Sequence, residues 1–157
     1  MAEIAIALGI AAFCLITIFG LLQVGLTSNQ NSLGQTTAAS LVSAVAADLR
    51  AAPPLVSGAT SSQTPVFQIA LPSPSSSGQT ISHVYFAEDG SRTSPGAANA
   101  RYLASVGITP PPPGRRGATL VRILVTWPAA MNANALPNQW PARFGGSLEA
   151  FMSLNRN

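Results

Sequence analysis

The chain has 157 residues, of which 47% are hydrophobic and 8% are charged, and its formal net charge is +3. This length suits one ordinary domain with an extension, and the charged fraction is well below the roughly 25% typical of soluble domains. All eight basic residues are arginines, and they are scattered, so the chain lacks the dense basic stripe of a dedicated nucleic-acid-binding protein. The single cysteine, Cys14, excludes an intrachain disulfide.

The first feature in chain order is an apolar run, IAIALGIAAFCLITIFGLLQVGL, which extends from Ile4 to Leu26 without a charged residue. One acid, Glu3, precedes it. A helix of this length spans about 34 Å, and the hydrocarbon core of a bilayer is roughly 30 Å thick. The run is longer than the apolar region of a cleavable secretory signal and lacks a basic region before it. We therefore predict a transmembrane helix.

Residues 27–52 predict an amphipathic continuation of this helix, because apolar side chains recur at helical spacing. These side chains are Leu33, Ala38, Leu41, Val42, Val45 and Leu49. We expect this stripe to pack on a head domain, with Asp48 and Arg50 facing water. The Pro53-Pro54 pair predicts the end of the helix, because proline removes a backbone donor and clashes with the preceding turn.

The composition changes sharply at Ala52, because all thirteen prolines follow it. We therefore predict two domains: an N-terminal helix over 1–52, with its transmembrane part at about 4–26 and its amphipathic half at 27–52, and a β-rich head over 53–157. Loops are expected over 53–65, 72–80 and 91–100, and a turn over 88–91. Residues 129–146 are expected to be irregular, with Trp140 and Phe144 as anchors.

Five stretches of the head predict β-strands, by alternation or by continuous β-branched and aromatic residues. They are 66–71, 81–87, 101–106, 118–127 and 147–154. The last alternates apolar with polar residues, which is typical of an antiparallel edge strand with one covered face. The amphipathic half of the helix is the natural cover. The predicted fold class is α+β, with a long N-terminal helix packed on a small antiparallel sheet.

Few residues of the chain carry catalytic chemistry. His83 is the only histidine, which nearly excludes a catalytic triad or a His-rich metal site, and a strand histidine is more often structural. The sequence contains no nucleophile elbow, no phosphate-binding glycine loop and no C-x-x-C. Glu88 and Asp89 are best interpreted as a solvated turn. We expect no enzymatic activity, no cofactor and no metal.

Arg115 and Arg116 form the only cluster of basic residues in the sequence. They are a weak candidate for contact with a ligand, with nucleic acid or with the acids of a neighbouring subunit. The ordinary interpretation is a solvated loop tip, next to the stiff proline run Pro110–Pro113.

Residues 3–11, EIAIALGIA, place an acid directly before an uninterrupted apolar helix, and an amphipathic continuation and a small sheet follow. This arrangement resembles the type IV pilin and type II secretion pseudopilin superfamily, where such a stretch follows the prepilin peptidase site. The longer string ALGIAAFCLITIFGLLQVGL, with LVTWPA at 124–129 and SLNRN at 153–157, is similar to prepilin-like Verru_Chthon cassette proteins.

The resemblance implies a structural subunit that waits in the inner membrane and then polymerises, through its N-terminal helix, into a cell-surface or periplasmic filament. The implied partners are further copies of the chain, the prepilin peptidase and the pilus or type II secretion assembly machinery. In the family the acid pairs with the α-amino group of a neighbouring subunit, and we carry this role to Glu3. Gly9, Gly20 and Gly25 are expected to let the helices approach closely, because small residues favour helix packing in membranes.

The chain departs from the family pattern in two ways. The family's glutamate is fifth in the mature chain, whereas Glu3 is third here and no basic leader precedes it. Either the N-terminus is processed, trimmed or rebuilt, or this subunit uses a different spacing. The helix-kinking proline of many pilins is replaced by a region with Gly20, Gln23 and Gly25.

Two other functions remain open. One is a monomeric, membrane-anchored periplasmic domain that binds a partner, with Glu3 at the membrane surface. The other is an adhesin or DNA-uptake subunit that uses Arg115 and Arg116. Salt-sensitive DNA binding would identify the second.

Overall fold

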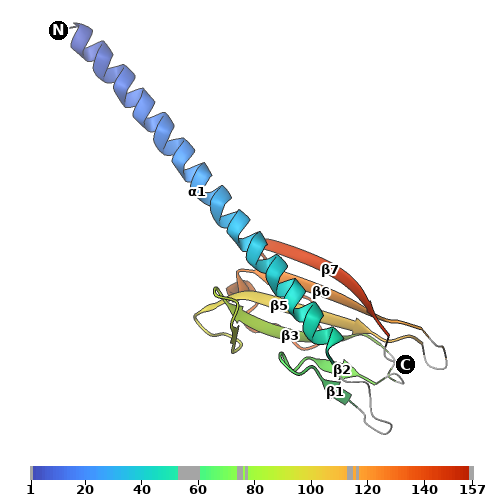
Figure 1. The fold of residues 1–157 in the computed structure, drawn as a ribbon. Helices are drawn as coiled ribbons and strands as arrows, with labels where there is room; N and C mark the ends of the chain where they lie inside the picture. The colour runs from blue at the N-terminus through green and yellow to red at the C-terminus, as the bar shows by residue number, and fades with distance from the viewer. Residues whose placement is uncertain are drawn as a thin grey trace. The chain divides into compact units, whose positions relative to one another are not determined.

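A computed structural model describes residues 2–52, 61–73, 76, 78–112, 115 and 117–155. Helix α1 spans Ala2–Arg50 (Figure 1). The chain divides into two compact units, Met1–Gly34 and Gln35–Asn157. The helix ends at Arg50, and the Ala51 N–H donates a last hydrogen bond to the Ala47 carbonyl at 2.9 Å. The Pro53-Pro54 pair lies outside the described residues.

The second unit contains a five-stranded antiparallel sheet in the order β4-β3-β5-β6-β7 (Figure 1). Its strands are β3 (Thr80–Ala87), β4 (Arg92–Thr93), β5 (Ala100–Thr109), β6 (Thr119–Trp127) and β7 (Gly146–Leu154). A small antiparallel sheet pairs β1 (Ser61–Gln63) with β2 (Ala70–Pro72), and one 3-10 helix, η1, spans Ala129–Asn132. The α+β fold class is therefore confirmed.

The core lies between the last turns of α1 and one face of the five-stranded sheet. Leu41, Val45 and Leu49 are 4%, 0% and 2% exposed and belong to one apolar cluster with residues of β3, β5 and β6. The prediction that this stripe packs on the head is confirmed from Ala38 onwards. The inclusion of Leu33 in the stripe is wrong, because its side chain is 61% exposed.

Asp48 does not face water as predicted, because its side chain is only 4% exposed. Its Oδ1 accepts a hydrogen bond from the Val66 N–H at 3.0 Å, and its Oδ2 accepts one from the Phe67 N–H at 2.9 Å. Helical periodicity predicted that Asp48 and Arg50 both face water, and Arg50 is exposed as expected. The sequence pattern gave no sign of the two backbone donors, which lie 18 and 19 residues further along the chain.

The strand predicted at 66–71 is wrong in extent, because β2 contains only Ala70–Pro72. Residues 65–67 form a turn, and Gln68 has a positive φ of 54°. The Thr64 hydroxyl accepts a hydrogen bond from the Ile69 N–H at 3.0 Å, which closes the turn. The apolar alternation that suggested a strand is nevertheless real, because Ile69 and Leu71 are buried and the Phe67 ring meets the Phe86 ring edge-on at 5.2 Å.

The other strands follow the sequence more closely. The strands predicted at 81–87, 118–127 and 147–154 are present as β3, β6 and β7, and Pro128 follows the end of β6. The strand predicted at 101–106 is longer, because β5 continues to Thr109 between two partners. Two short strands, β1 and β4, fall in segments that were expected to be loops.

The segment after β6 lies against the face of the sheet that points away from α1. The Tyr85 hydroxyl donates to the Asn132 carbonyl at 3.0 Å, and the Asn138 side-chain oxygen accepts from the Ile81 N–H at 3.0 Å. Trp140 is half-buried under the Arg122 guanidinium, 4.1 Å from the ring centroid, so its predicted role as an anchor is confirmed. The same prediction for Phe144 is wrong, because its side chain is 45% exposed.

Gly146 is required by a close approach between β6 and β7. A Cβ at this position would lie 2.3 Å from the Trp127 ring. That ring is 8% exposed and packs edge-on against Tyr102 at 6.1 Å, so it has little freedom to move. Glycine therefore sets how closely the last strand joins the sheet.

Candidate functional site: the exposed apolar surface of helix α1

The first unit presents apolar side chains to the outside on every side of the helix. The large apolar residues from Ile4 to Leu26 are 54% to 73% exposed, with Leu15 and Phe13 at the two extremes. A helix that is apolar all round is normally buried in a membrane or among other helices. Among the described residues, none covers this surface.

By length and composition, helix α1 is able to cross a membrane. Thr17, near the middle of the apolar run, is compatible with apolar surroundings because its hydroxyl donates to the Phe13 carbonyl at 2.8 Å. This bond gives the hydroxyl an acceptor, which the lipid tails cannot provide. Cys14, close to it in the chain, is a free and exposed thiol.

Glu3 lies in the first turn of α1 and is exposed. An acid at this position interacts favourably with the positive end of the helix dipole, by about 0.3–1 kcal/mol at an exposed site. Among the described residues it has no ion-pair partner. The carboxylate is therefore available to a group outside the chain.

The three glycines of the apolar run lie in open space. A Cβ at Gly9, Gly20 or Gly25 would meet no atom within 4 Å. Gly9 and Gly20 are eleven residues apart, about three helical turns, so they lie on the same side of the helix. Gly25 lies on a different side. No contact among the described residues therefore requires glycine at these positions.

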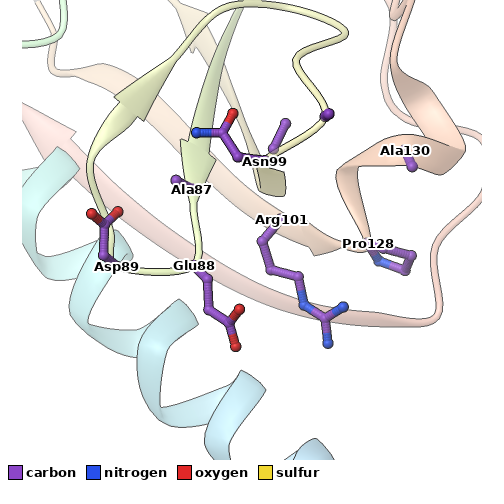
Figure 2. A pocket seen from close by; sticks show the side chains of 9 residues that line it. Ala87, Glu88, Asp89, Asn99, Arg101, Pro128 and Ala130 are labelled. Atoms are coloured by element: carbon purple, nitrogen blue, oxygen red, sulfur yellow. The ribbon is translucent and has the colours of Figure 1, made fainter.

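A shallow, open pocket of about 540 Å³ lies where β3 and β5 meet the end of β6. Its polar lining comes from Glu88, Asp89, Asn99 and Arg101 (Figure 2). In the figure the Glu88 and Arg101 side chains extend in the same direction, whereas the Asp89 carboxylate turns away. Asp89 accepts hydrogen bonds from the Ser91 hydroxyl at 2.7 Å and from the Ser91 N–H at 2.9 Å.

These two bonds, the hydroxyl first, hold the pKa of Asp89 below its ordinary value. The Asp89 side chain therefore serves to stabilise its own turn. No sequence pattern connects Arg101 with Glu88, because the two residues become neighbours only through the pairing of Ala87 with Ala100. The pocket is open to solvent, and its polar groups do not converge on a common point as they would in a binding site.

The remaining candidates are not brought together. Arg115 is exposed, and its N–H donates to the Pro112 carbonyl at 3.1 Å, while Arg116 lies outside the described residues. His83 contacts the Ser105 hydroxyl through Nδ1 at 2.9 Å and the Leu136 carbonyl through Nε2 at 3.1 Å. A carbonyl only accepts, so Nε2 carries a proton and His83 ties the segment after η1 to the sheet.

Within the described ranges, no three His, Cys, Asp or Glu side chains gather where they could hold a metal ion. Comparison with family models, with curated proteins and with solved structures found no match. The long apolar helix and the antiparallel sheet on which its last turns pack are compatible with a pilin-like fold.

Proposed function

We propose that the chain is the structural subunit of a pilus-like filament, held in the inner membrane before assembly and at the cell surface or in the periplasm afterwards. It polymerises through the apolar half of α1, with further copies of itself as partners. A prepilin peptidase and a pilus or type II secretion machinery act on it. The head has no catalytic role in this proposal.

One observation carries the proposal. The large apolar residues from Ile4 to Leu26 are all more than half exposed, whereas Leu41, Val45 and Leu49 of the same helix are almost fully buried. Leaving that much apolar surface in water is costly, at about 25 cal/mol per Å². Lipid covers this surface before assembly, and neighbouring helices cover it in the filament.

Glu3 sets the step between subunits in this proposal. Its carboxylate enters an apolar bundle, where an unpaired charge is expensive, and pairing with the α-amino group of a neighbouring copy offsets that cost. Gly9 and Gly20, on one side of the helix, let a neighbouring backbone come close.

The test begins with electron microscopy of material sheared from cells that make the protein, together with mass spectrometry of its N-terminus. Regular filaments that contain this chain are expected. The N-terminal mass identifies the processed start and any methylation. A chain that stays in the membrane fraction as a monomer would overturn the proposal.

Substitution of Glu3 refines the test. Glu3→Gln is expected to insert into the membrane normally but to lower filament yield at least tenfold, because the neutral amide cannot pair with an ammonium group as the carboxylate does. Glu88→Gln is the matched control, since it removes the same charge from an exposed position of the head and leaves yield unchanged. Normal filaments from Glu3→Gln would exclude the role of Glu3.

A second candidate is a monomeric, membrane-anchored binding module, which the same membrane-length helix also favours. In that case Gly9→Leu and Gly20→Leu leave the protein's behaviour unchanged, because lipid accommodates larger side chains. In the filament they block close helix packing. Filament yield and membrane retention of these variants separate the two functions.

A further inference from the structure

Strand β7 forms one edge of the five-stranded sheet (Figure 1). It pairs with β6 over its whole length, from Gly146 opposite Trp127 to Leu154 opposite Thr119, without a shift in register. Within the described parts of the chain, no strand pairs with its other side. The backbone N–H and C=O groups on that side are therefore placed to bind a further strand.

This edge lacks the features that usually prevent pairing. Proteins protect edge strands by keeping them short or by adding proline, lysine or a bulge. Strand β7 has nine residues and none of these features. Its one charge, Glu149, is paired with Arg122 of β6, and Phe151 is 74% exposed. By contrast, β4 at the opposite edge has two residues, one of them Arg92.

The sequence of β7 is only partly symmetric about Ala150. Reading outwards from it, Glu149 corresponds to Phe151, Leu148 to Met152, and Ser147 to Ser153. Two such strands in antiparallel register place each residue opposite its counterpart and on the same face of the sheet. The like charges of the two Glu149 residues are then not directly opposed, which avoids a destabilising pair.

We propose that β7 pairs antiparallel with β7 of a second copy, about a two-fold axis at Ala150, and joins the two sheets edge to edge. On the face toward α1, Leu148 and Met152 are half-buried at the free edge. Leu148 of one copy packs on Met152 of the other, and both side chains lose their remaining contact with water. On the outer face, Phe151 lies across from Glu149 of the second copy.

This contact differs from the one proposed for the filament. Subunits along a helical filament meet through different surfaces, whereas a two-fold contact uses the same surface twice and closes after two copies. Pairing through β7 therefore joins two chains side by side and does not extend a filament. One strand pair buries less surface than a stable dimer interface, so the contact is weak in dilute solution.

Cysteine cross-linking in the full-length protein in detergent tests the proposal, with Cys14→Ser as the background. In this register Ala150 is the only residue that lies opposite the same residue of the second copy. Ala150→Cys is therefore expected to form a disulfide dimer, because directly opposed Cα atoms lie about 4.5–5.5 Å apart. Ser147→Cys and Ser153→Cys are each expected to stay monomeric alone and to cross-link when mixed.

These matched variants exclude random collision, because Ser147 and Ser153 are both exposed. The proposal is overturned if Ala150→Cys does not cross-link, or if Ser147→Cys alone reacts as fast as the mixture. Both results are interpretable without filaments, since pairing through β7 does not depend on the apolar half of α1.

Charge variants at Phe151, made in the Ala150→Cys background, check the register. Phe151→Lys faces Glu149 of the second copy and is attracted, whereas Phe151→Glu is repelled. We expect at least threefold faster cross-linking with lysine than with glutamate at low salt, and a smaller difference at high salt. Unchanged tryptophan fluorescence shows that the head is folded. Equal rates for the two variants would overturn this register. Equal rates are expected if the copies meet only through non-specific apolar contact, because both variants remove the Phe151 side chain.

Discussion

The two halves of helix α1 contain similar apolar residues in different surroundings. From Ile4 to Leu26 the large side chains are 54% to 73% exposed. From Ala38 to Leu49 the apolar stripe is almost completely buried against the sheet. One half completes the core of its own head, and the other presents a surface for which the described chain has no cover. Composition alone therefore does not say where an apolar helix finds its partner.

The difference lies in how the residues are distributed around the helix. The second half carries polar residues between its apolar ones, so one side fits a sheet and the other is solvated. The first half is apolar on all sides, and no single sheet face could cover it. Stability of the head should therefore depend on the second half only, and the proposed assembly on the first.

The largest expected effect compares Leu49 with Leu21. Leu49→Ala removes a side chain that is 2% exposed, and we expect it to lower the free energy of unfolding of the head by about 2–5 kcal/mol. Leu21 is 69% exposed, so Leu21→Ala should change the same quantity by less than about 0.5 kcal/mol. Denaturant unfolding in detergent, followed by the fluorescence of Trp127 and Trp140, measures both. Equal losses would contradict the comparison.

The next effect concerns Asp48, the buried acid of the second half. Asp48→Ala leaves the N–H groups of Val66 and Phe67 without their acceptor, and we expect a loss of about 1–3 kcal/mol. Asp48→Asn keeps one acceptor oxygen and should lose less. Arg50→Ala, at the exposed end of the helix, is the control. Hydrogen exchange at Val66 and Phe67 should accelerate in Asp48→Ala, and unchanged protection there would contradict this role.

Glycine substitutions sharpen the comparison, because they should act in opposite directions in the two units. Gly146→Ala forces a Cβ to within 2.3 Å of the buried Trp127 ring, so we expect a loss of about 1–3 kcal/mol. Gly20→Ala meets no neighbouring atom and should strengthen the helix by about 1 kcal/mol. Thermal melting followed by circular dichroism distinguishes the head from the helix. A destabilised helix in Gly20→Ala would show that a contact within the chain requires this glycine.

The smallest effect contrasts an exposed acid of the head with Asp48. Ser91→Ala removes the hydroxyl that donates to Asp89, so the pKa of Asp89 should rise towards its ordinary value. Because the folded-state pKa is lowered, the interaction stabilises the head above the ordinary pKa of an aspartate and is lost as the pH falls through the lowered value. A carboxyl titration by NMR measures the change. An unchanged pKa would assign the shift to the Ser91 N–H alone.

Sequence patterns predicted the elements that depend on local chemistry. The two-residue alternation of β7 and the β-branched run of β6 specified those strands, and the stripe from Ala38 to Leu49 specified the buried side of the helix. The pattern failed at residues 66–69, where Asp48 and Thr64 hold the backbone in a turn although the apolar alternation is that of a strand. Hydrogen bonds between distant residues overrode the local preference there.

The sequence by itself determined the apolar helix, its acid at Glu3 and the α+β class of the chain, because these depend on spacing and composition over short stretches. The burial of Asp48 and the approach of Gly146 to Trp127 were decided only by the tertiary structure. Each of these depends on which distant backbone or ring lies opposite a residue. That information is contained in the order of the strands, which no short stretch of sequence specifies.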